Sequence, residues 1–204
     1  MPTFAAAQSA HRAALERLFA GETPAYLLCL TSDYAGYYGP CEDAAFARWR
    51  DGELDKIADN LLLAGEDAVN FRPPVVEFSP LGVHWVDALF GVRVYQFAGQ
   101  WWADPLPGRL ADLDGVDVPG SPQVAWMTAA LADLLARLPA ELEVAGPVFS
   151  STLNAAINLF GERALEDVLD PGPETIGGLR AITDAICRLH GWLRGVFPAR
   201  VRFY

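Results

Sequence analysis

Residues 143–190 read EVAGPVFSSTLNAAINLFG followed by ERALEDVLDPGPETIGGLRAITDAICRLH. The apolar run 142–145 stops at Gly146 and the proline after it, which is typical of a buried parallel strand that leads into a loop. Small polar residues fill that loop. The Asp-Pro-Gly-Pro sequence at 170–173 then separates two helices, because Pro173 suits a first helical turn, where its missing N–H would be unpaired anyway. This stretch predicts a strand, a loop and two helices.

Apolar residues recur at spacings of three and four after this break, which predicts one buried face of a long helix. These residues are Ile176, Leu179, Ile182, Ile186, Leu189, Leu193 and Val196. Elsewhere, apolar runs predict strands at 25–30, 68–71 and 200–204, and helical patterns cover 5–20, 42–63 and 121–138. Strands that alternate with helices indicate an α/β protein with a parallel sheet.

Residues 72–120 interrupt this alternation. They contain six prolines, which disfavour a long helix or a central strand. Within them, residues 92–97 alternate in polarity and meet residues 100–104 across Ala98-Gly99, which predicts a β-hairpin. We expect this hairpin to lie outside the main sheet as a lid or plug of an inserted region.

The composition restricts the partners. A net charge of -11 repels phosphate backbones, so nucleic acid is not an expected partner. No apolar run approaches the roughly 20 residues that span a bilayer, and the N-terminal residues do not resemble a secretion signal. We therefore expect a cytoplasmic protein without a membrane partner. The three cysteines lack a Cys-x-x-Cys spacing and are interpreted as reduced thiols.

Residues 143–190 resemble the uroporphyrinogen decarboxylase superfamily. The resemblance rests on the strand ending in Gly-Pro, the turn bearing Thr and Asn, the Leu-Phe-Gly sequence at 159–161, the Asp-Pro break and the Leu-x-x-Ile-Thr-Asp-x-Ile sequence at 179–186. It implies a (β/α)8 barrel. The superfamily includes decarboxylases of haem synthesis and cobalamin- or corrinoid-dependent methyltransferases.

A full barrel has eight strands and typically about 250 residues. Residues 1–204 are therefore predicted to be a single, incomplete domain, the N-terminal half of a TIM-type barrel with an inserted β-hairpin in residues 72–120. Two copies of the chain that close one barrel are the alternative, since an open parallel edge favours pairing.

The loops that carry substrate residues in this family differ here. As the resemblance implies, the decarboxylases have Arg-Gln-Ala-Gly-Arg-Tyr after the first strand, whereas residues 33–38 read Asp-Tyr-Ala-Gly-Tyr-Tyr. After the second strand those enzymes place an Asp, and this chain has Asn70 and Arg72. After the Gly-Pro strand they place a Tyr, and here the nearby residues are Asn154 and Asn158. Uroporphyrinogen itself is therefore not the expected substrate.

The methyltransferase branch, as the resemblance implies, binds zinc through a His-x-Cys pair and a later Cys, which activates a thiol as thiolate. No His-x-Cys sequence occurs in this chain. Cys187 and His190 are three residues apart, but the apolar helix face accounts for Cys187 and leaves His190 at its boundary. We therefore expect no metal or cofactor site within this chain; zinc and a corrinoid would belong to a longer form.

The loops after the strands form the expected ligand face. The candidate substrate-binding residues are Asp33, Tyr34, Tyr37, Tyr38, Asn70, Arg72, His84, Asn154 and Asn158. Each has a structural alternative: the tyrosines pack under a lid, Arg72 pairs with a carboxylate, and the two asparagines cap a helix. Histidine is suited to acid–base chemistry at neutral pH, but a His beside Trp85 also suits a packed boundary. No catalytic residue is assigned.

The expected function follows from the resemblance. It is a uroporphyrinogen-decarboxylase-like barrel protein whose longer form transfers a methyl group with a corrinoid or thiol cofactor, on a small-molecule substrate and with a corrinoid protein as a partner. One alternative is decarboxylation of a carboxylated, porphyrinogen-like substrate, with Arg72 as the anion clamp. The other is a non-catalytic half barrel that binds a ligand or assembles into a homo-oligomer.

Overall fold

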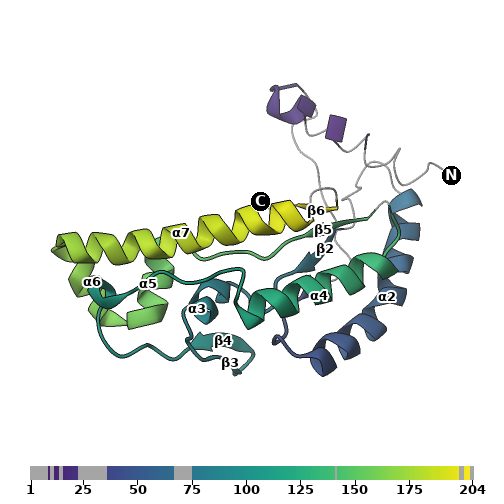
Figure 1. Ribbon diagram of the computed structural model, residues 1–204. Helices are drawn as coiled ribbons and strands as arrows, with labels where there is room; N and C mark the ends of the chain where they lie inside the picture. Colours follow the sequence, from purple (N-terminus) through teal and green to yellow (C-terminus); the bar gives the residue numbers. More distant parts are fainter. Residues whose placement is uncertain are drawn as a thin grey trace.

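A computed structural model describes residues 9, 12–13, 16–22, 36–66, 75–140, 142–197 and 200–202 (Figure 1). The strands predicted at 25–30 and 68–71 lie outside the described residues. So do four candidate residues, Asp33, Tyr34, Asn70 and Arg72.

The main sheet is parallel throughout. Its strands are β1 (Gly36–Tyr37), β2 (Val75–Phe78), β5 (Glu143–Ala145) and β6 (Val201–Arg202), in the order β1-β2-β5-β6. Each neighbouring pair runs in the same direction, with Val76 opposite Val144 and Val144 opposite Val201. The predicted α/β class with a parallel sheet is confirmed.

Two strands lie where the sequence did not predict them. β1 lies in the segment 31–40, which was interpreted as a loop, and β2 lies inside the region 72–120, which was interpreted as an insertion. Prolines disfavour a strand that contains them, but Pro73 and Pro74 precede β2, which needs only four residues. The inserted region therefore begins after Phe78 and not at residue 72.

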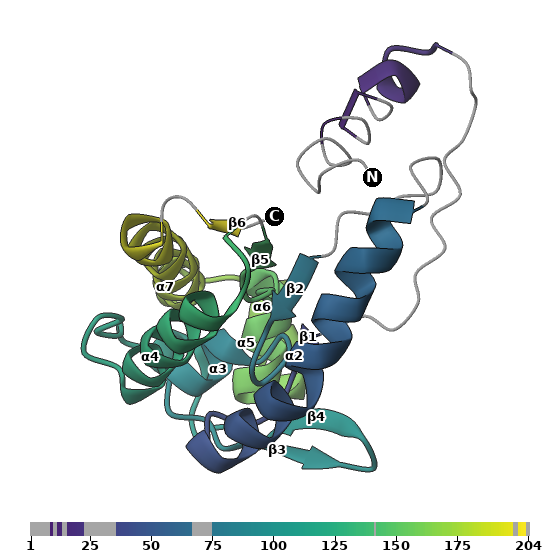
Figure 2. The same cartoon turned by 90° about the vertical axis from the view of Figure 1, so that its right-hand side faces the viewer.

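Three long helices pack beside this sheet: α2 (Asp43–Glu66), α4 (Pro122–Arg137) and α7 (Pro173–Val196) (Figures 1 and 2). Their positions confirm the helices predicted at 42–63, 121–138 and after the Asp-Pro break. Buried side chains of all three helices and of the strands form one hydrophobic cluster. In α4 the buried side chains include Val124, Met127, Leu131 and Leu134, and Leu138 just after the helix is buried as well. No helix within the described ranges is long and apolar enough to cross a membrane.

The buried face of α7 is rotated from the predicted one. Ile182, Leu189 and Leu193 are buried as predicted, whereas Ile176 and Val196 are exposed. The buried positions also include Thr175, Gly178 and Ala185, which are small or polar residues. At Gly178, α7 approaches the short 3-10 helix η1 (Leu110–Asp112) so closely that a Cβ would overlap the carbonyl of Leu110.

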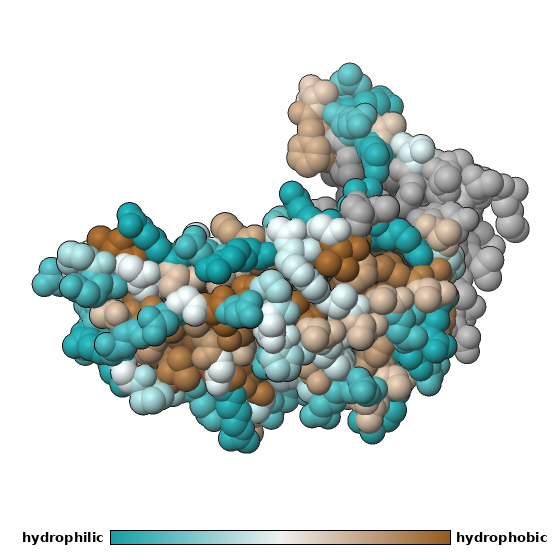
Figure 3. Space-filling view, in the orientation of Figure 1, coloured by the Kyte–Doolittle hydropathy of each residue, from teal (hydrophilic) through white to brown (hydrophobic). Residues whose placement is uncertain are grey.

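A second cluster lies under α3 (Trp85–Leu89), α5 (Thr152–Phe160) and α6 (Glu162–Leu169). The side chain of Arg109, just before η1, donates to Asp167 of α6 at 2.8 Å, and the same carboxylate accepts from the backbone N–H of Leu110 at 3.2 Å. These bonds attach η1 to α6. Exposed Leu165, Leu169 and Ile176 lie where α6 and α7 meet, at the end of the molecule that shows a hydrophobic spot in Figure 3.

The predicted hairpin is confirmed. β3 (Val94–Phe97) and β4 (Gln100–Ala103) form a separate antiparallel sheet, with Ala98 and Gly99 in the turn at positive φ. Figure 2 shows it at the lower edge of the molecule. The indole N–H of Trp101 donates to the carbonyl of Tyr38 at 2.9 Å, so the hairpin is attached to the loop after β1.

Candidate functional site

The candidate site lies where the loops after β1, β2 and β5 meet. These loops follow parallel strands, so they leave the sheet at one edge, where α/β proteins bind ligands. The backbone N–H of Leu81 donates to the carbonyl of Gly39 at 3.0 Å, and that of Val148 donates to the hydroxyl of Ser79 at 3.2 Å. The hydroxyl of Ser150 donates to the carbonyl of Val83 at 3.2 Å. The three loops are thus joined to one another by hydrogen bonds.

A strained turn follows β2. Leu81 and Gly82 both have positive φ, 59° and 58°, and for Leu81 this conformation costs about 1–2 kcal/mol. The turn is held by the Ser79 hydroxyl, which donates to the carbonyl of Gly82 at 3.0 Å, and by the burial of the Leu81 side chain. The turn places His84 at the N-terminus of α3. Strained backbone maintained in this way is concentrated at functional sites.

Three polar side chains converge at α3. Nδ1 of His84 lies 2.7 Å from Oδ2 of Asp87, and the side-chain amide of Asn158 donates to the same oxygen at 2.8 Å. A contact of 2.7 Å requires a proton between the two atoms. We assign it to Nδ1, which makes Nε2 the acceptor nitrogen in the uncharged tautomer. With this tautomer, Asn158 Nδ2 and His84 Nδ1 both donate to Oδ2 of Asp87. Their separation of 3.4 Å is therefore a contact between two donors and not a hydrogen bond.

Asp87 is fully buried, while the His84 side chain is 12% exposed. All five residues of α3 are buried, and Asp87 is the one polar residue among them. Its second oxygen, Oδ1, is also buried and has no hydrogen-bond partner among the described residues. An apolar side chain would occupy such a position at lower cost, since a buried carboxylate must give up its hydration. This unfavourable placement makes Asp87 a candidate site residue.

The arrangement resembles the His–Asp pairs of acid–base catalysis. A carboxylate that accepts from Nδ1–H fixes the tautomer and the direction of the ring, which leaves Nε2 to exchange a proton with a substrate. Asn158 holds the same carboxylate from α5. The site therefore combines one residue able to move a proton, His84, with two residues that position it.

The other described candidates have different surroundings. Tyr37 is in β1 and is 2% exposed; its hydroxyl donates to the carbonyl of Pro40 at 2.6 Å, and its ring packs in an aromatic cluster with Phe46 and Phe78. It is therefore a core residue. The Tyr38 ring is exposed. Asn154 is exposed, and its backbone N–H donates to Ser151, so Ser151 and not an asparagine caps α5.

Asp87 was missed as a functional residue. The sequence places it three residues after His84, a spacing that brings two side chains together on one helical turn. This was the available signal. The meeting of this pair with Asn158, 71 residues beyond Asp87, follows from the packing of α3 on α5.

No family model, curated protein or solved structure matches this chain. The functional interpretation therefore rests on the geometry around His84 and on the sequence resemblance.

Cys187 and His190 have different surroundings on α7. Cys187 is exposed on α7, and His190 is partly buried with its ring edge-on to Phe149, at a centroid distance of 6.4 Å. Burial, and then the charge of Arg194, lower the pKa of His190. Within the described ranges no group of three His, Cys, Asp or Glu side chains could hold a metal ion.

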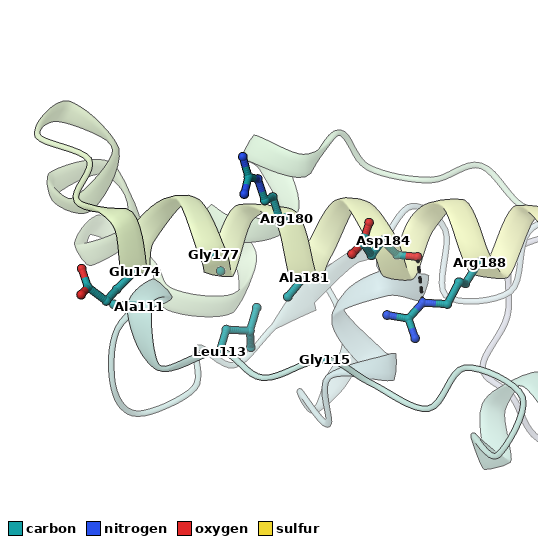
Figure 4. Close-up of a pocket in the computed structure, with 10 residues that line it drawn as sticks. Ala111, Leu113, Gly115, Glu174, Gly177, Arg180, Ala181, Asp184 and Arg188 are labelled. Carbon is teal, nitrogen blue, oxygen red and sulfur yellow. Dashed lines mark hydrogen bonds between the residues drawn. The ribbon is translucent and has the colours of Figure 1, made fainter.

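A separate hollow of about 460 Å³ lies along α7 beside residues 111–115 (Figure 4). Glu174, Arg180, Asp184 and Arg188 line it, and Arg180 points away from residues 111–115 in this view. Nε of Arg188 donates to the backbone carbonyl of Asp184 at 3.3 Å. The mixture of charges and the open shape are typical of a solvated surface groove.

Proposed function

We propose that this chain is part of a small-molecule enzyme, built as half of a uroporphyrinogen-decarboxylase-like barrel, in which His84 accepts a proton during the transfer of a methyl group to a thiol or hydroxyl. The observation that carries the proposal is the contact of 2.7 Å between His84 Nδ1 and the buried Asp87, shared with Asn158. Its place at the carboxyl edge of a parallel sheet supports a ligand site.

The assigned tautomer determines the direction of proton transfer. With Nδ1–H directed at Asp87, Nε2 has a free lone pair and acts as a base. It takes the proton from the S–H or O–H of the acceptor, and the freed lone pair of that sulfur or oxygen forms the new bond to the methyl carbon. The bond between the methyl group and its donor breaks, and its electron pair remains with the donor. The positive charge of the resulting His84 imidazolium is neutralised by the Asp87 carboxylate.

The identity of the transferred group is supported by the resemblance to the methyltransferase branch of the superfamily. When bound, a corrinoid would supply the methyl group. The residues described here would act on the acceptor: His84 moves the proton, while Asp87 and Asn158 orient its ring. The loops around them are joined by hydrogen bonds and keep this geometry before the acceptor binds.

The test compares His84→Asn with the unmodified full-length protein, using methylcobalamin as methyl donor and 2-mercaptoethanol as acceptor. Asn keeps a side-chain N–H near the position of Nδ1 but removes Nε2. We expect the rate of thioether formation, measured by mass spectrometry, to fall about 100-fold or more, the usual contribution of a general base. His190→Asn makes the same chemical change outside the His84–Asp87–Asn158 group and should leave the rate nearly unchanged. Equal rates in the His84 variant and the unmodified protein would contradict the proposal.

Two further assays on the same full-length protein distinguish the two alternative functions. Release of CO₂ from uroporphyrinogen that depends on Arg72 would favour the decarboxylase. Binding of a thiol without turnover, with His84→Asn binding as well as the unmodified chain, would favour the non-catalytic module.

A further inference from the structure

The three loops around His84 lack cationic side chains. Residues 38–42, 79–84 and 146–151 contain neither Lys nor Arg, and Glu42 is their only Asp or Glu residue. Arg202 lies nearby in β6, opposite Ala145, but it is engaged in an interaction of its own. An anionic group seated at His84 would therefore meet no free guanidinium or ammonium group from these loops, and the net charge of -11 would add to the repulsion.

The same loops expose apolar side chains. Tyr38 is 42% exposed, Val83 43%, Val148 52%, and Leu153, in the first turn of α5, 44%. Each of the three loops thus presents at least one apolar residue to solvent. Val83 is next to His84 in the chain, and the backbone of Val148 is hydrogen-bonded to Ser79 in the same turn.

Hydrogen bonds and packing hold the backbone of this apolar rim, which is formed by Tyr38, Val83, Val148 and Leu153. The Ser150 hydroxyl holds the carbonyl of Val83, and Trp101 holds the carbonyl of Tyr38. Trp101 also packs on the strained turn, since a Cβ built on Gly82 would lie 3.0 Å from its ring. A preformed apolar surface binds a ligand with little loss of conformational entropy.

We propose that this rim selects an uncharged acceptor, a molecule with an apolar body that contacts Val83 and Val148 and with a single thiol or hydroxyl that reaches Nε2 of His84. The proposal rests on the proposed function, in which the hydroxyl or thiol of the acceptor gives its proton to His84. It adds the substrate class: neutral and apolar, in place of the polycarboxylate that the family's arginines would hold.

The test uses two probes of similar shape, benzyl alcohol and benzoate, and does not depend on turnover. Diethyl pyrocarbonate modifies accessible imidazole nitrogen, and mass spectrometry of the His84 peptide gives the rate of modification in the full-length protein. We expect benzyl alcohol at about nine times its Kd to slow modification of His84 by about tenfold, because a competing ligand slows the reaction by the factor 1 + [L]/Kd. Benzoate at the same concentration should have little effect.

A charge variant makes the test sharper. Val148→Lys places an ammonium group on the rim, so protection by benzoate should appear and protection by benzyl alcohol should weaken. Leu169→Lys makes a comparable change at an exposed apolar residue of α6 and should leave both probes as in the unmodified protein.

Protection by benzoate equal to or stronger than that by benzyl alcohol in the unmodified protein would overturn the inference, and so would protection by neither probe. Either result leaves the proposed function intact if methyl transfer to 2-mercaptoethanol still requires His84. Conversely, selective protection by benzyl alcohol without any methyl transfer would support the neutral site and contradict the proposed reaction.

Discussion

Asp87 occupies an environment that few carboxylates tolerate. It is fully buried on a short helix whose other residues are apolar, and it directs one oxygen at both His84 and Asn158. Such a residue is better explained by the orientation of the imidazole than by stability, because buried ion pairs contribute little net free energy of folding.

The variant Asp87→Asn should separate these roles. Asn has nearly the same shape, so we expect the protein to remain folded. Its amide can donate to Nδ1, which favours the tautomer with the proton on Nε2 and removes the base. We expect the rate of methyl transfer to fall by about 100-fold or more. We also expect the ¹⁵N chemical shifts of Nδ1 and Nε2 of His84 to change places, because the proton moves from Nδ1 to Nε2. A folded variant with unchanged ring shifts would show that Asp87 does not set the tautomer.

Among the elements, α7 and η1 approach each other closely. Gly178 faces the carbonyl of Leu110, while Gly177, on the next position of the same helix, has no described atom within 4 Å of a Cβ built on it. These two glycines therefore offer a matched pair, because the intrinsic helix propensity gained on substitution by Ala is the same for both.

We expect Gly177→Ala to raise the free energy of unfolding by about 0.5–1 kcal/mol, because Ala loses less backbone entropy in a helix. Gly178→Ala should lower it by about 1–3 kcal/mol, since the methyl group pushes α7 away from η1. Urea unfolding of both variants measures the difference. If the free energy of unfolding were the same for Gly178→Ala and Gly177→Ala, α7 and η1 would not approach each other as closely as described.

Over the whole molecule, two acidic groups of the core are shifted in the same direction. Burial, and then the charge of Glu42, raise the pKa of the Cys41 thiol from 9.0 to about 12. Burial also raises the pKa of Tyr37, with smaller contributions from Cys41 and Glu42. Both groups keep their protons in the folded state at a pH where the unfolded chain has begun to release them.

Stability should therefore fall at alkaline pH. The contribution of Cys41 is fully present below its unfolded pKa of 9.0 and is lost as the pH rises toward about 12. Urea midpoints measured at neutral pH and at several values between these limits check this expectation. Cys41→Ser removes one titrating group, so the decline should become shallower even if the variant is less stable throughout. An unchanged slope would show that Cys41 does not contribute.

Several elements were predictable because their signals are local. The apolar repeat of α4, the Gly-Pro end of β5, the proline at the start of α7 and the turn at Ala98-Gly99 each act over a few residues. β1 and β2 were not predicted, because very short strands carry little pattern of their own. They are defined by pairing with neighbours that are distant in the sequence.

The candidate site shows the same division. His84 and Asn158 were recognised as polar residues near strand ends, and the His84–Asp87 spacing was visible on one turn of helix. Their common geometry was not visible, because 71 residues separate Asp87 from Asn158 and only the packing of α3 on α5 brings the two side chains within 2.8 Å. The core position of Tyr37 was likewise decided by the rings around it.

The sequence by itself determined the α/β class, the long helices and the hairpin, since hydrophobic periodicity and turn residues act through neighbouring positions. The tertiary structure alone decided which loops meet at the edge of the sheet, which oxygen His84 and Asn158 share, and which apolar residues surround them. The physical reason is that hydrogen bonds and burial depend on distances between segments, and these distances exist only after the chain has packed.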